Sequence, residues 1–337
     1  MRDVGDPDAI AGTYRGSSCL VTGGLGFIGS NLALALLEAG AETRVLDSLE
    51  PRHGGDRAHL AGSAAEVTIG DIADPALAAK LLDGVDFVFN LAGQVSHIDS
   101  ITEPLRDLEI NATSQLSLLE TTRTVNPRAR VVYSSTRQIY GRPRSLPVTE
   151  EHPIEPVDVN GVSKHAADRL HLIYHQVHEL PATVLRLSNV YGPRQRLEGD
   201  HQGFLPVFVR RALAGEEIVL FGDGSQRRDC LYVDDAVSAL LAAASDEDAV
   251  GEVFNIGHHD DHSLVEIAAA VTAAAGGGEV VRRPWPPGHE RIAIHSFRTD
   301  HSKAERVLGW RPSWDLADGL AATVAHLREG KVGTPRS

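Results

Sequence analysis

The sequence is poor in cysteine, with only Cys19 and Cys230 in 337 residues. Two cysteines so far apart cannot form the disulfide framework of a secreted scaffold, and neither stands in a cluster with metal-ligand spacing. We therefore expect both to be small core side chains. Lysine is also scarce. Only four of the 32 basic residues are lysines, so a lysine inside a motif stands out.

Positive charge and long apolar runs are lacking as well. The 32 Lys and Arg residues are outnumbered by 46 Asp and Glu residues, which gives a formal net charge of −14. A surface of this sign repels nucleic acid and anionic lipid headgroups. The N-terminal residues do not have the basic-then-apolar pattern of a signal peptide, and no stretch of about 18 apolar residues is present to span a bilayer. These absences predict a soluble cytoplasmic protein that binds neither nucleic acid nor membrane.

The first 190 residues alternate short β-branched runs with helical patterns, which is typical of successive βαβ units around a parallel sheet. The predicted fold class is α/β, a Rossmann-type doubly wound parallel sheet in residues 1–190. Residues 191–337 are expected to form mainly a smaller C-terminal substrate domain, with parts of 226–260 returning to the first domain. The expected strands are 18–22, 43–47, 66–69, 87–90, 130–134 and 183–187, and the expected helices are 30–39, 76–82, 104–124 and 160–179.

The sharpest motif is ValThrGlyGlyLeuGlyPheIleGlySer (21–30), which lies directly after the first expected strand and opens a helix. Its glycines Gly23, Gly26 and Gly29 lack a β-carbon, so the loop can turn tightly and its backbone can approach a pyrophosphate. The helix N-terminus adds unpaired N–H groups and the positive end of the helix dipole. The motif therefore predicts a dinucleotide site.

Two carboxylates follow the next two strands. Asp47 ends the second strand, 18 residues past Gly29, where it can accept hydrogen bonds from both hydroxyls of the adenosine ribose and would repel a 2′-phosphate. This position favours NAD over NADP. Asp71 follows the third strand and either receives the adenine amino group or caps the helix that begins near Ala76.

Further segments agree in order and spacing with one enzyme family. The chain resembles the extended short-chain dehydrogenases/reductases, the NAD-dependent sugar-nucleotide epimerases and dehydratases, from Ser18 to about Trp314. The segments that carry the resemblance are ThrGlyGlyLeuGlyPheIleGly (22–29), GlyAspIle (70–72), AsnLeuAlaGly (90–93), SerSerThrArgGlnIleTyrGly (134–141), ArgLeuSerAsnValTyrGlyPro (186–193), GlyAspGlySerGlnArgArgAspCysLeuTyrValAspAsp (222–235) and AspHisSerLysAla (300–304).

The resemblance implies residue roles at the matching positions. Thr136 matches the catalytic Ser/Thr that hydrogen-bonds the reacting sugar hydroxyl, and Lys164 matches the lysine that holds the nicotinamide ribose. Asn189 and Arg228 match residues that hold the diphosphate of a nucleotide sugar, a task that suits arginine. The implied cofactor-binding positions are Gly23, Gly26, Phe27, Ile28, Gly29, Asp47, Asp71, Ile72, Ala92, Asn111 and Lys164.

The resemblance breaks at Asn160. The family carries a tyrosine four residues before the lysine, on the same helix face, and as a phenolate it removes the sugar hydroxyl proton. Here the segment is ValAspValAsnGlyValSerLys (157–164), and an amide cannot act as a general base. Losing such a base typically costs about 10²–10⁴ in rate. Three interpretations follow: another group, Lys164 itself or Thr136 through water, takes the proton; the reaction differs from the usual ones; or the protein binds without catalysing.

A second departure concerns the two residues after Thr136. Dehydratases of the family place an Asp-Glu pair there, and a decarboxylase branch places a glutamate at the second position, whereas this chain has Arg137 and Gln138. These donors suit a substrate carboxylate or hydroxyl, and surface residues at a strand end would look the same. The sequence favours an NAD-dependent epimerase of a nucleotide-activated sugar, working through a transient keto sugar, with Asn160 as a positioning residue. The alternatives are a net NAD-dependent oxidoreductase and a catalytically silent NAD or nucleotide-sugar binding protein.

Metal binding and assembly complete the predictions. His171, His175 and His178 recur on one expected helix and HisHisAspAspHis (258–262) forms a polar stretch, but neither has a pattern that completes a site, so we expect no metal. In the resembled family, helices equivalent to 104–124 and 160–179 form a four-helix bundle between subunits. The resemblance therefore implies a homodimer.

Overall fold

Seven parallel strands form the central sheet of the computed structural model, which describes residues 12–51, 55–197, 203–285, 294 and 296–332. The strand order is β3-β2-β1-β4-β5-β6-β11, and every neighbouring pair runs parallel. The predicted doubly wound α/β fold is confirmed. The strands are β1 (Ser18–Thr22), β2 (Glu42–Asp47), β3 (Glu66–Ile69), β4 (Phe87–Asn90), β5 (Arg130–Thr136), β6 (Ala182–Leu187) and β11 (Val253–Ile256).

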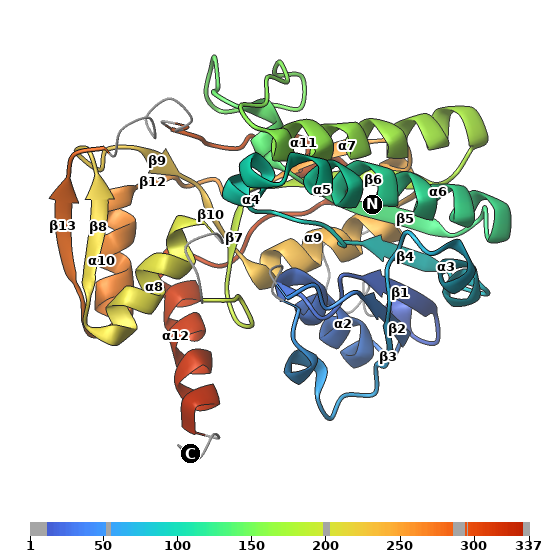
Figure 1. Cartoon of the computed structure of the whole chain (residues 1–337), viewed down its shortest axis with the longest axis horizontal. Helices are drawn as coiled ribbons and strands as arrows, with labels where there is room; N and C mark the ends of the chain where they lie inside the picture. Colours follow the sequence, from blue (N-terminus) through green and yellow to red (C-terminus); the bar gives the residue numbers. More distant parts are fainter. Residues whose placement is uncertain (1–11, 52–54, 198–202, 286–293, 295, 333–337) are drawn as a thin grey trace.

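Helices cover both faces of this sheet (Figure 1). On one face α2 (Phe27–Glu38) packs on α9 (Val233–Ser245), and on the other α3 (Pro75–Leu82), α6 (Ser114–Val125) and α7 (Val159–His178) lie side by side. Because helices shield both faces, the central strands are largely buried, and all five residues of β1 are buried. The chain changes face between β3 and β4, so a crevice opens above the strand ends near β1 and β4.

The expected helix 104–124 is present but is not regular throughout. It consists of α5 (Pro104–Leu108), a π-helical turn over Glu109–Thr113 and then α6, and it follows the short helix α4 (His97–Thr102). A π-turn widens the backbone by one residue and is often found at functional sites. Here it shifts Asn111 and its neighbours toward the segment that follows β4, to which Asn111 is hydrogen-bonded.

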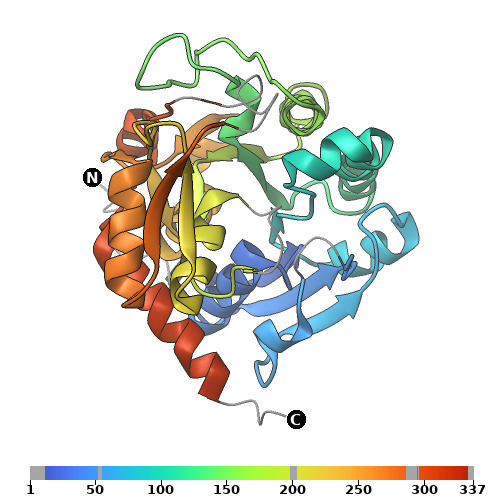
Figure 2. The same ribbon diagram turned by 60° about the vertical axis from the view of Figure 1, so that its left-hand side comes forward.

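Among the described residues, three small two-stranded sheets and three helices form the C-terminal part, which lies beside one end of the central sheet (Figures 1 and 2). Within residues 226–260, α9 and β11 belong to the layered sheet unit, because β11 pairs with β6. The small sheets pair β7 (Asn189–Tyr191) with β10 (Cys230–Tyr232), β9 (Arg227–Arg228) with β12 (His262–Ser263) and β8 (Glu217–Phe221) with β13 (Glu279–Arg283). The helices of this part are α8 (Phe204–Ala214), α10 (Leu264–Ala275) and α12 (Leu316–Val332), whereas α11 (Ser302–Leu308) packs on β11 and α9 of the sheet unit. The 3-10 turns span Arg57–Leu60, Arg137–Tyr140 and Glu247–Ala249.

One hydrophobic core joins the two parts of the molecule. It runs from α2 through α9 into α8, α10 and α12, so the C-terminal elements are fixed to the sheet by shared apolar packing. Cys19 and Cys230 are free and buried in this core, as expected. No helix among the described residues is both long and apolar enough to cross a membrane.

Candidate functional site

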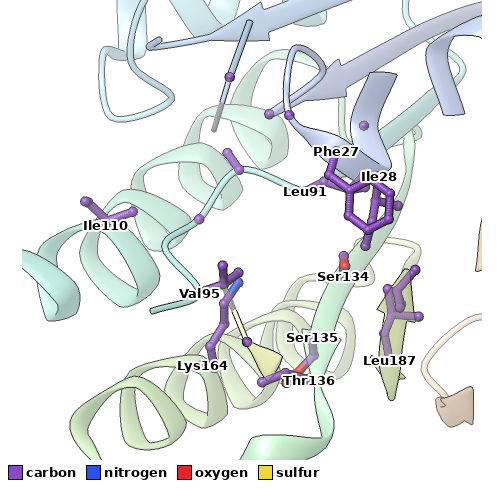
Figure 3. Close-up of a pocket in the computed structure, with 18 of the residues that line it drawn as sticks. Phe27, Ile28, Leu91, Val95, Ile110, Ser134, Ser135, Thr136, Lys164 and Leu187 are labelled. Carbon is purple, nitrogen blue, oxygen red and sulfur yellow. The ribbon is translucent and has the colours of Figure 1, made fainter. Parts of the chain in front are cut away.

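A cavity of about 500 Å³ lies over the carboxyl ends of β1, β2, β4, β5 and β6. This is the edge at which open parallel sheets bind their ligands, because the strand order reverses there. Figure 3 shows Phe27 and Ile28 from the start of α2 on one side of the cavity, and Lys164 of α7 with Thr136 of β5 on the other. The cavity is large enough to enclose most of a dinucleotide-sized ligand.

The glycine motif forms a cradle at one wall of this cavity. Gly23 has a φ of +67°, and a β-carbon there would lie 2.9 Å from the backbone of Ala92. A β-carbon on Gly29 would lie 2.2 Å from the carbonyl oxygen of Gly23. Helix α2 begins without a side-chain cap and has no acidic residue in its first turn. Its first N–H groups therefore remain available to an anion in the cavity.

The two predicted carboxylates lie at the β2–β3 end of the cavity. Asp47 accepts hydrogen bonds from the amides of Leu25 (3.0 Å) and Leu49 (2.8 Å), which orient its carboxylate and leave each oxygen a further lone pair. Asp71 also lines the cavity and accepts from the Ala73 amide (2.9 Å). It does not cap α3, because the N-cap of that helix is Asp74.

The opposite end of the cavity is rich in donors. Arg137 donates to the amide oxygen of Asn189 (2.9 Å) and lies over the ring of Phe297, and its Nη1 is buried without a partner among the described residues. Burial lowers the pKa of Arg228 to about 9, and the nearby charge of Arg137 adds to this effect. An anion bound beside these two buried guanidinium groups relieves the repulsion between them, so this end of the cavity favours an anionic ligand.

Thr136 ends β5 between these two regions. Its hydroxyl accepts from the Gln138 amide (3.3 Å) and caps the 3-10 turn that carries Arg137 and Gln138. This bond fixes the hydroxyl oxygen while its proton can still rotate toward a ligand. Gln138 lines the cavity too, and its amide oxygen is buried without a partner among the described residues.

Lys164 is the one lysine in the lining of the cavity that the described residues form. Its amino group lies 5.4 Å from the ring centre of Tyr133, and a β-carbon at Gly93 would lie 2.6 Å from it. Burial lowers its pKa to about 8, against the opposing effect of the carboxylates of Asp107 and Asp168. An amino group with this pKa gains and loses its proton close to neutral pH.

Asn111 and Asn160 lie behind the cavity wall, outside its lining in the part of the chain that the structure describes. The Asn160 amide group points at the backbone oxygen of Gln94 (3.0 Å), its side-chain oxygen (2.9 Å) and the carboxylate of Asp107 (3.0 Å). Asn111 also bonds to Gln94 and Asp107. Both asparagines therefore brace the segment after β4 rather than reaching into the cavity.

The sequence analysis did not identify His97, which lines the cavity at the start of α4. Its Nδ1 is hydrogen-bonded to the carboxylate of Asp158, the N-cap residue of α7. One sequence feature could have identified His97: it lies three residues after Gln94, in the segment that follows the end of a parallel strand, where site residues are common. Its partner is 61 residues away, so the pair is visible only in the fold.

Comparison with known proteins decides the family. The model of the NAD dependent epimerase/dehydratase family matches residues 19–257. The chain belongs to this family. It is 33% identical to the UDP-glucose 4-epimerase of Mycolicibacterium smegmatis over 92% of this chain and 98% of that protein.

Solved structures of the family agree with the fold. A UDP-glucose 4-epimerase from Thermotoga maritima, determined with UDP-glucose, superposes with a TM-score of 0.85 at 33% identity and covers 93% of this chain and 99% of that one. A dTDP-glucose 4,6-dehydratase from Streptomyces venezuelae with NAD bound gives 0.84 at 32% identity, covering 94% and 98%. Both activities thus occur among similar proteins.

NAD is the cofactor of this epimerase/dehydratase family member, and the cavity fits it. The glycine cradle has no room for a single β-carbon at Gly29, and the uncapped start of α2 faces the same space. The structure brings into one lining the predicted residues Gly23, Gly26, Phe27, Ile28, Gly29, Asp47, Asp71, Ile72, Ala92, Thr136, Arg137, Gln138, Lys164, Asn189 and Arg228.

One group of described residues has metal-ligand spacing, and it lies outside this lining. His258, His259 and Asp260 place one ligand atom each within 4.8 Å of the others. The Nδ1 atom of His258 already accepts a hydrogen bond from the Asp260 amide (3.0 Å). The expectation that the protein uses no metal stays a prediction.

Proposed function

We propose that this family member is an NAD-dependent epimerase of a nucleotide-activated sugar that works through a transient keto sugar. The observation that carries the proposal is the pairing of Thr136 and Lys164 in one cavity whose neighbouring donor end contains no acid-base carboxylate. Among the described residues, the carboxylates that line the cavity are Asp47, Glu50 and Asp71, which follow β2 and β3. Expulsion of water needs a general acid and a base near the sugar, and this end of the cavity has arginine and glutamine instead.

Different residues of the chain bind different parts of the cofactor. Asp47 accepts hydrogen bonds from the adenosine ribose, and the cradle of Gly23, Gly26 and Gly29 with the amides of Phe27 and Ile28 receives the pyrophosphate. Lys164 holds the nicotinamide ribose. When bound, NAD supplies the site with a hydride acceptor that is regenerated within the same turnover. The remaining contacts of the cofactor are assigned to Asp71, Ile72 and Ala92, with Asn111 acting behind the wall.

Donors at the other end bind the nucleotide sugar. Arg228 and Nη1 of Arg137, which has no partner among the described residues, receive the diphosphate, and Asn189 holds Arg137 in place through its amide oxygen. Gln138 contacts the sugar with its amide oxygen, which likewise has no partner in the part of the chain that the structure describes. Thr136 orients the reacting hydroxyl, and Asn160 positions the segment after β4.

A homodimer belongs to the same proposal. Apolar side chains are exposed along α4, α5, α6 and α7, on the outer side of one helical layer. Leu105 is 82% exposed and Val177 is 66% exposed, which is unusual for residues of this size in a monomer surface and suits a second copy of the chain. The exposed members are Ile98, Ile101, Leu105, Leu108, Leu116, Val125, Val162, Ile173 and Val177.

The decisive experiment combines cofactor analysis with product analysis. The purified protein is denatured, its released dinucleotide is identified by mass spectrometry, and native protein is incubated with a panel of UDP-, GDP- and dTDP-sugars. Bound NAD together with an isomeric sugar and no net NADH is the expected result. Net NADH would indicate an oxidoreductase instead, a deoxy-keto product a dehydratase, and bound NAD without any product a silent binding protein.

A further inference from the structure

The proposed epimerase needs a group that accepts the proton of the sugar hydroxyl, and in the proposal Lys164, which has a lowered pKa, is assigned to the nicotinamide ribose. Among the described residues no tyrosine lines the cavity. Tyr133 is buried below Lys164, and burial holds its pKa well above the ordinary value, so it stays protonated. Tyr140 is bound between Arg186 and Asn255. Asp47, Glu50 and Asp71 follow β2 and β3, on the side of the cavity that suits adenosine.

His97 and Asp158 form a pair at the side of the cavity where a base is needed. Asp158 precedes Asn160 by two residues, so the pair stands beside the helix turn at which the resemblance places a tyrosine. The Asp158 side chain is 6% exposed and the His97 side chain is 39% exposed, so the carboxylate is covered while the imidazole reaches the cavity. One carboxylate oxygen of Asp158 accepts from the Gly161 amide (2.8 Å) as the helix cap, and the other contacts Nδ1 of His97.

This contact decides which nitrogen of His97 can accept a proton. A carboxylate at Nδ1 stabilises the tautomer with hydrogen on Nδ1, which leaves Nε2 as the basic nitrogen. The interaction acts on the carboxylate as well. Burial alone would raise the pKa of Asp158, but the hydrogen bonds from His97 and from the Gly161 amide counteract it, and the pKa lies below its usual value. Asp158 therefore remains an anion that stabilises the imidazolium once it forms.

Resting on the proposed function, we infer that His97, oriented by Asp158, takes the place of the missing tyrosine as the proton acceptor. The O–H bond of the sugar breaks and its proton passes to Nε2 of His97. The C–H bond at the same carbon breaks with its electron pair, which leaves as hydride to the bound NAD, and a C=O bond forms. Return of hydride to the other face of the keto sugar, with return of the proton from His97, restores both groups.

Asn160 has a defined part in this arrangement as a positioning residue. Its amide group holds Gln94 at the backbone and the side chain, and the Gln94 side chain donates to the Ser96 carbonyl (2.9 Å). Ser96 then caps α4 by accepting from the Asp99 amide (3.1 Å). The Ser96 carbonyl belongs to the peptide bond that leads into His97, the first residue of α4. An asparagine at 160 thus fixes the segment that presents the histidine.

Kinetics of matched variants test the inference on the sugar that the wild-type holoenzyme converts. His97→Gln should lower kcat by about 10²–10⁴-fold with KM within about threefold, because a general base is lost while binding is kept. Asp158→Asn keeps a good helix cap and removes the charge, so a smaller loss of kcat is expected. The control is His259→Gln: His259 also faces an aspartate, Asp260 at 3.4 Å, but lies outside the cavity lining, and its loss should leave kcat unchanged.

Two readouts separate a base from a structural role. Added imidazole should restore part of the activity of His97→Ala and none of the activity of Lys164→Ala. Proton NMR of the NAD-loaded protein should show a strongly deshielded Nδ1 proton that is lost in His97→Gln and Asp158→Asn and kept in His259→Gln. The NMR measurement requires no turnover.

The outcomes are distinct. Loss of kcat with imidazole rescue and the deshielded proton supports the inference. An active wild type whose His97→Gln variant retains kcat within about twofold, or an unrescued variant whose loss lies in KM, overturns it and leaves the epimerase proposal standing. A wild type that converts no sugar overturns the epimerase proposal and the proton-acceptor role with it, and the resonance then shows whether the pair itself exists.

Discussion

At the scale of single residues, the site contains residues that destabilise the fold or that tolerate no replacement. Lys164 is the clearest case, because a buried ammonium group loses its hydration and is only partly compensated by Asp107 and Asp168. Gly29 is another, because a β-carbon there would overlap the carbonyl oxygen of Gly23. Each gives a prediction that does not depend on knowing the substrate.

Lys164 should make the stability of the cofactor-free protein depend on pH. A free lysine has a pKa of about 10.4, whereas burial lowers that of Lys164 to about 8. Between these values the unfolded chain binds the proton and the folded chain does not, so the group's contribution to stability rises with pH and is lost as pH falls through about 8. Compared with Lys164→Met, the wild type should gain up to about 3 kcal/mol between pH 8 and 10.4. Paired thermal unfolding curves across this range check the difference, and parallel curves for the two proteins would contradict it.

Gly29→Ala should abolish tight NAD binding. The new β-carbon would lie 2.2 Å from the Gly23 carbonyl oxygen, so the cradle must open and its amides move away from the pyrophosphate. Calorimetric titration should show affinity at least about tenfold weaker, or ~1.4 kcal/mol. Gly12→Ala is the matched control, because a β-carbon there meets nothing within 4 Å. Equal affinity in both variants would show that the cradle is not the cofactor site.

At the scale of elements, the first turn of α7 organises the end of the cavity at which Lys164 and His97 lie. Asp158 caps the turn and contacts His97, Asn160 holds Gln94, and Lys164 follows one turn later. The π-turn before α6 contributes Asn111 to the same cluster, and Ser163 is hydrogen-bonded to the Asp107 carboxylate that these amides share. The segment after β4 is therefore held by two helices that are far from it in sequence.

Asn160→Ala should lower kcat by more than its loss of folding stability can explain. Removing the amide leaves buried acceptors on Gln94 and Asp107 with fewer donors, at a cost of about 1–3 kcal/mol. Asn126→Ala is matched in chemistry, because Asn126 donates to the carbonyls of Leu82 (3.0 Å) and Val85 (2.7 Å) away from the cavity. Thermal melts should show comparable losses for the two variants, and only Asn160→Ala should reduce kcat. Equal kinetic behaviour would mean that the tether has no part in catalysis.

At the scale of the whole molecule, the core shared by the sheet and the C-terminal elements fixes the two ends of the cavity relative to each other. β7 and β9, which supply Asn189 and Arg228, lie beyond the sheet, yet Arg137 on the sheet side bonds directly to Asn189. On the outside, the apolar side chains of α4–α7 leave one helical layer unpartnered in the single chain.

Charging this layer should separate the proposed dimer. Leu105→Glu combined with Val177→Glu places two carboxylates on the exposed apolar face, and a buried unpaired charge is costly at an interface. Light scattering after size exclusion should give the monomer mass for this variant and twice that mass for the wild type. Val67→Glu changes a 39% exposed valine on β3, away from this layer, and should remain dimeric. A monomeric wild type would refute the assembly.

The sequence by itself determined the parts of this protein that are local or periodic. Alternating strand and helix patterns predicted the sheet, and the glycine motif predicted a helix that opens after β1, although α2 begins at Phe27, three residues before the expected start at Ser30. Asp47 was predicted because it ends a strand, and Thr136 was predicted through the family resemblance. Most of the predicted site residues accordingly lie in one cavity.

Only the tertiary structure decided what the asparagines and the histidine do. Asn111 and Asn160 occupy positions that suggest a place in the cleft, but their amides turn to Gln94 and Asp107, because a buried amide lies where acceptors are. His97 meets Asp158 across 61 residues, and Arg137 meets Asn189 across 52. No periodicity encodes such contacts, since they arise when separate strands and helices pack at one edge of a sheet.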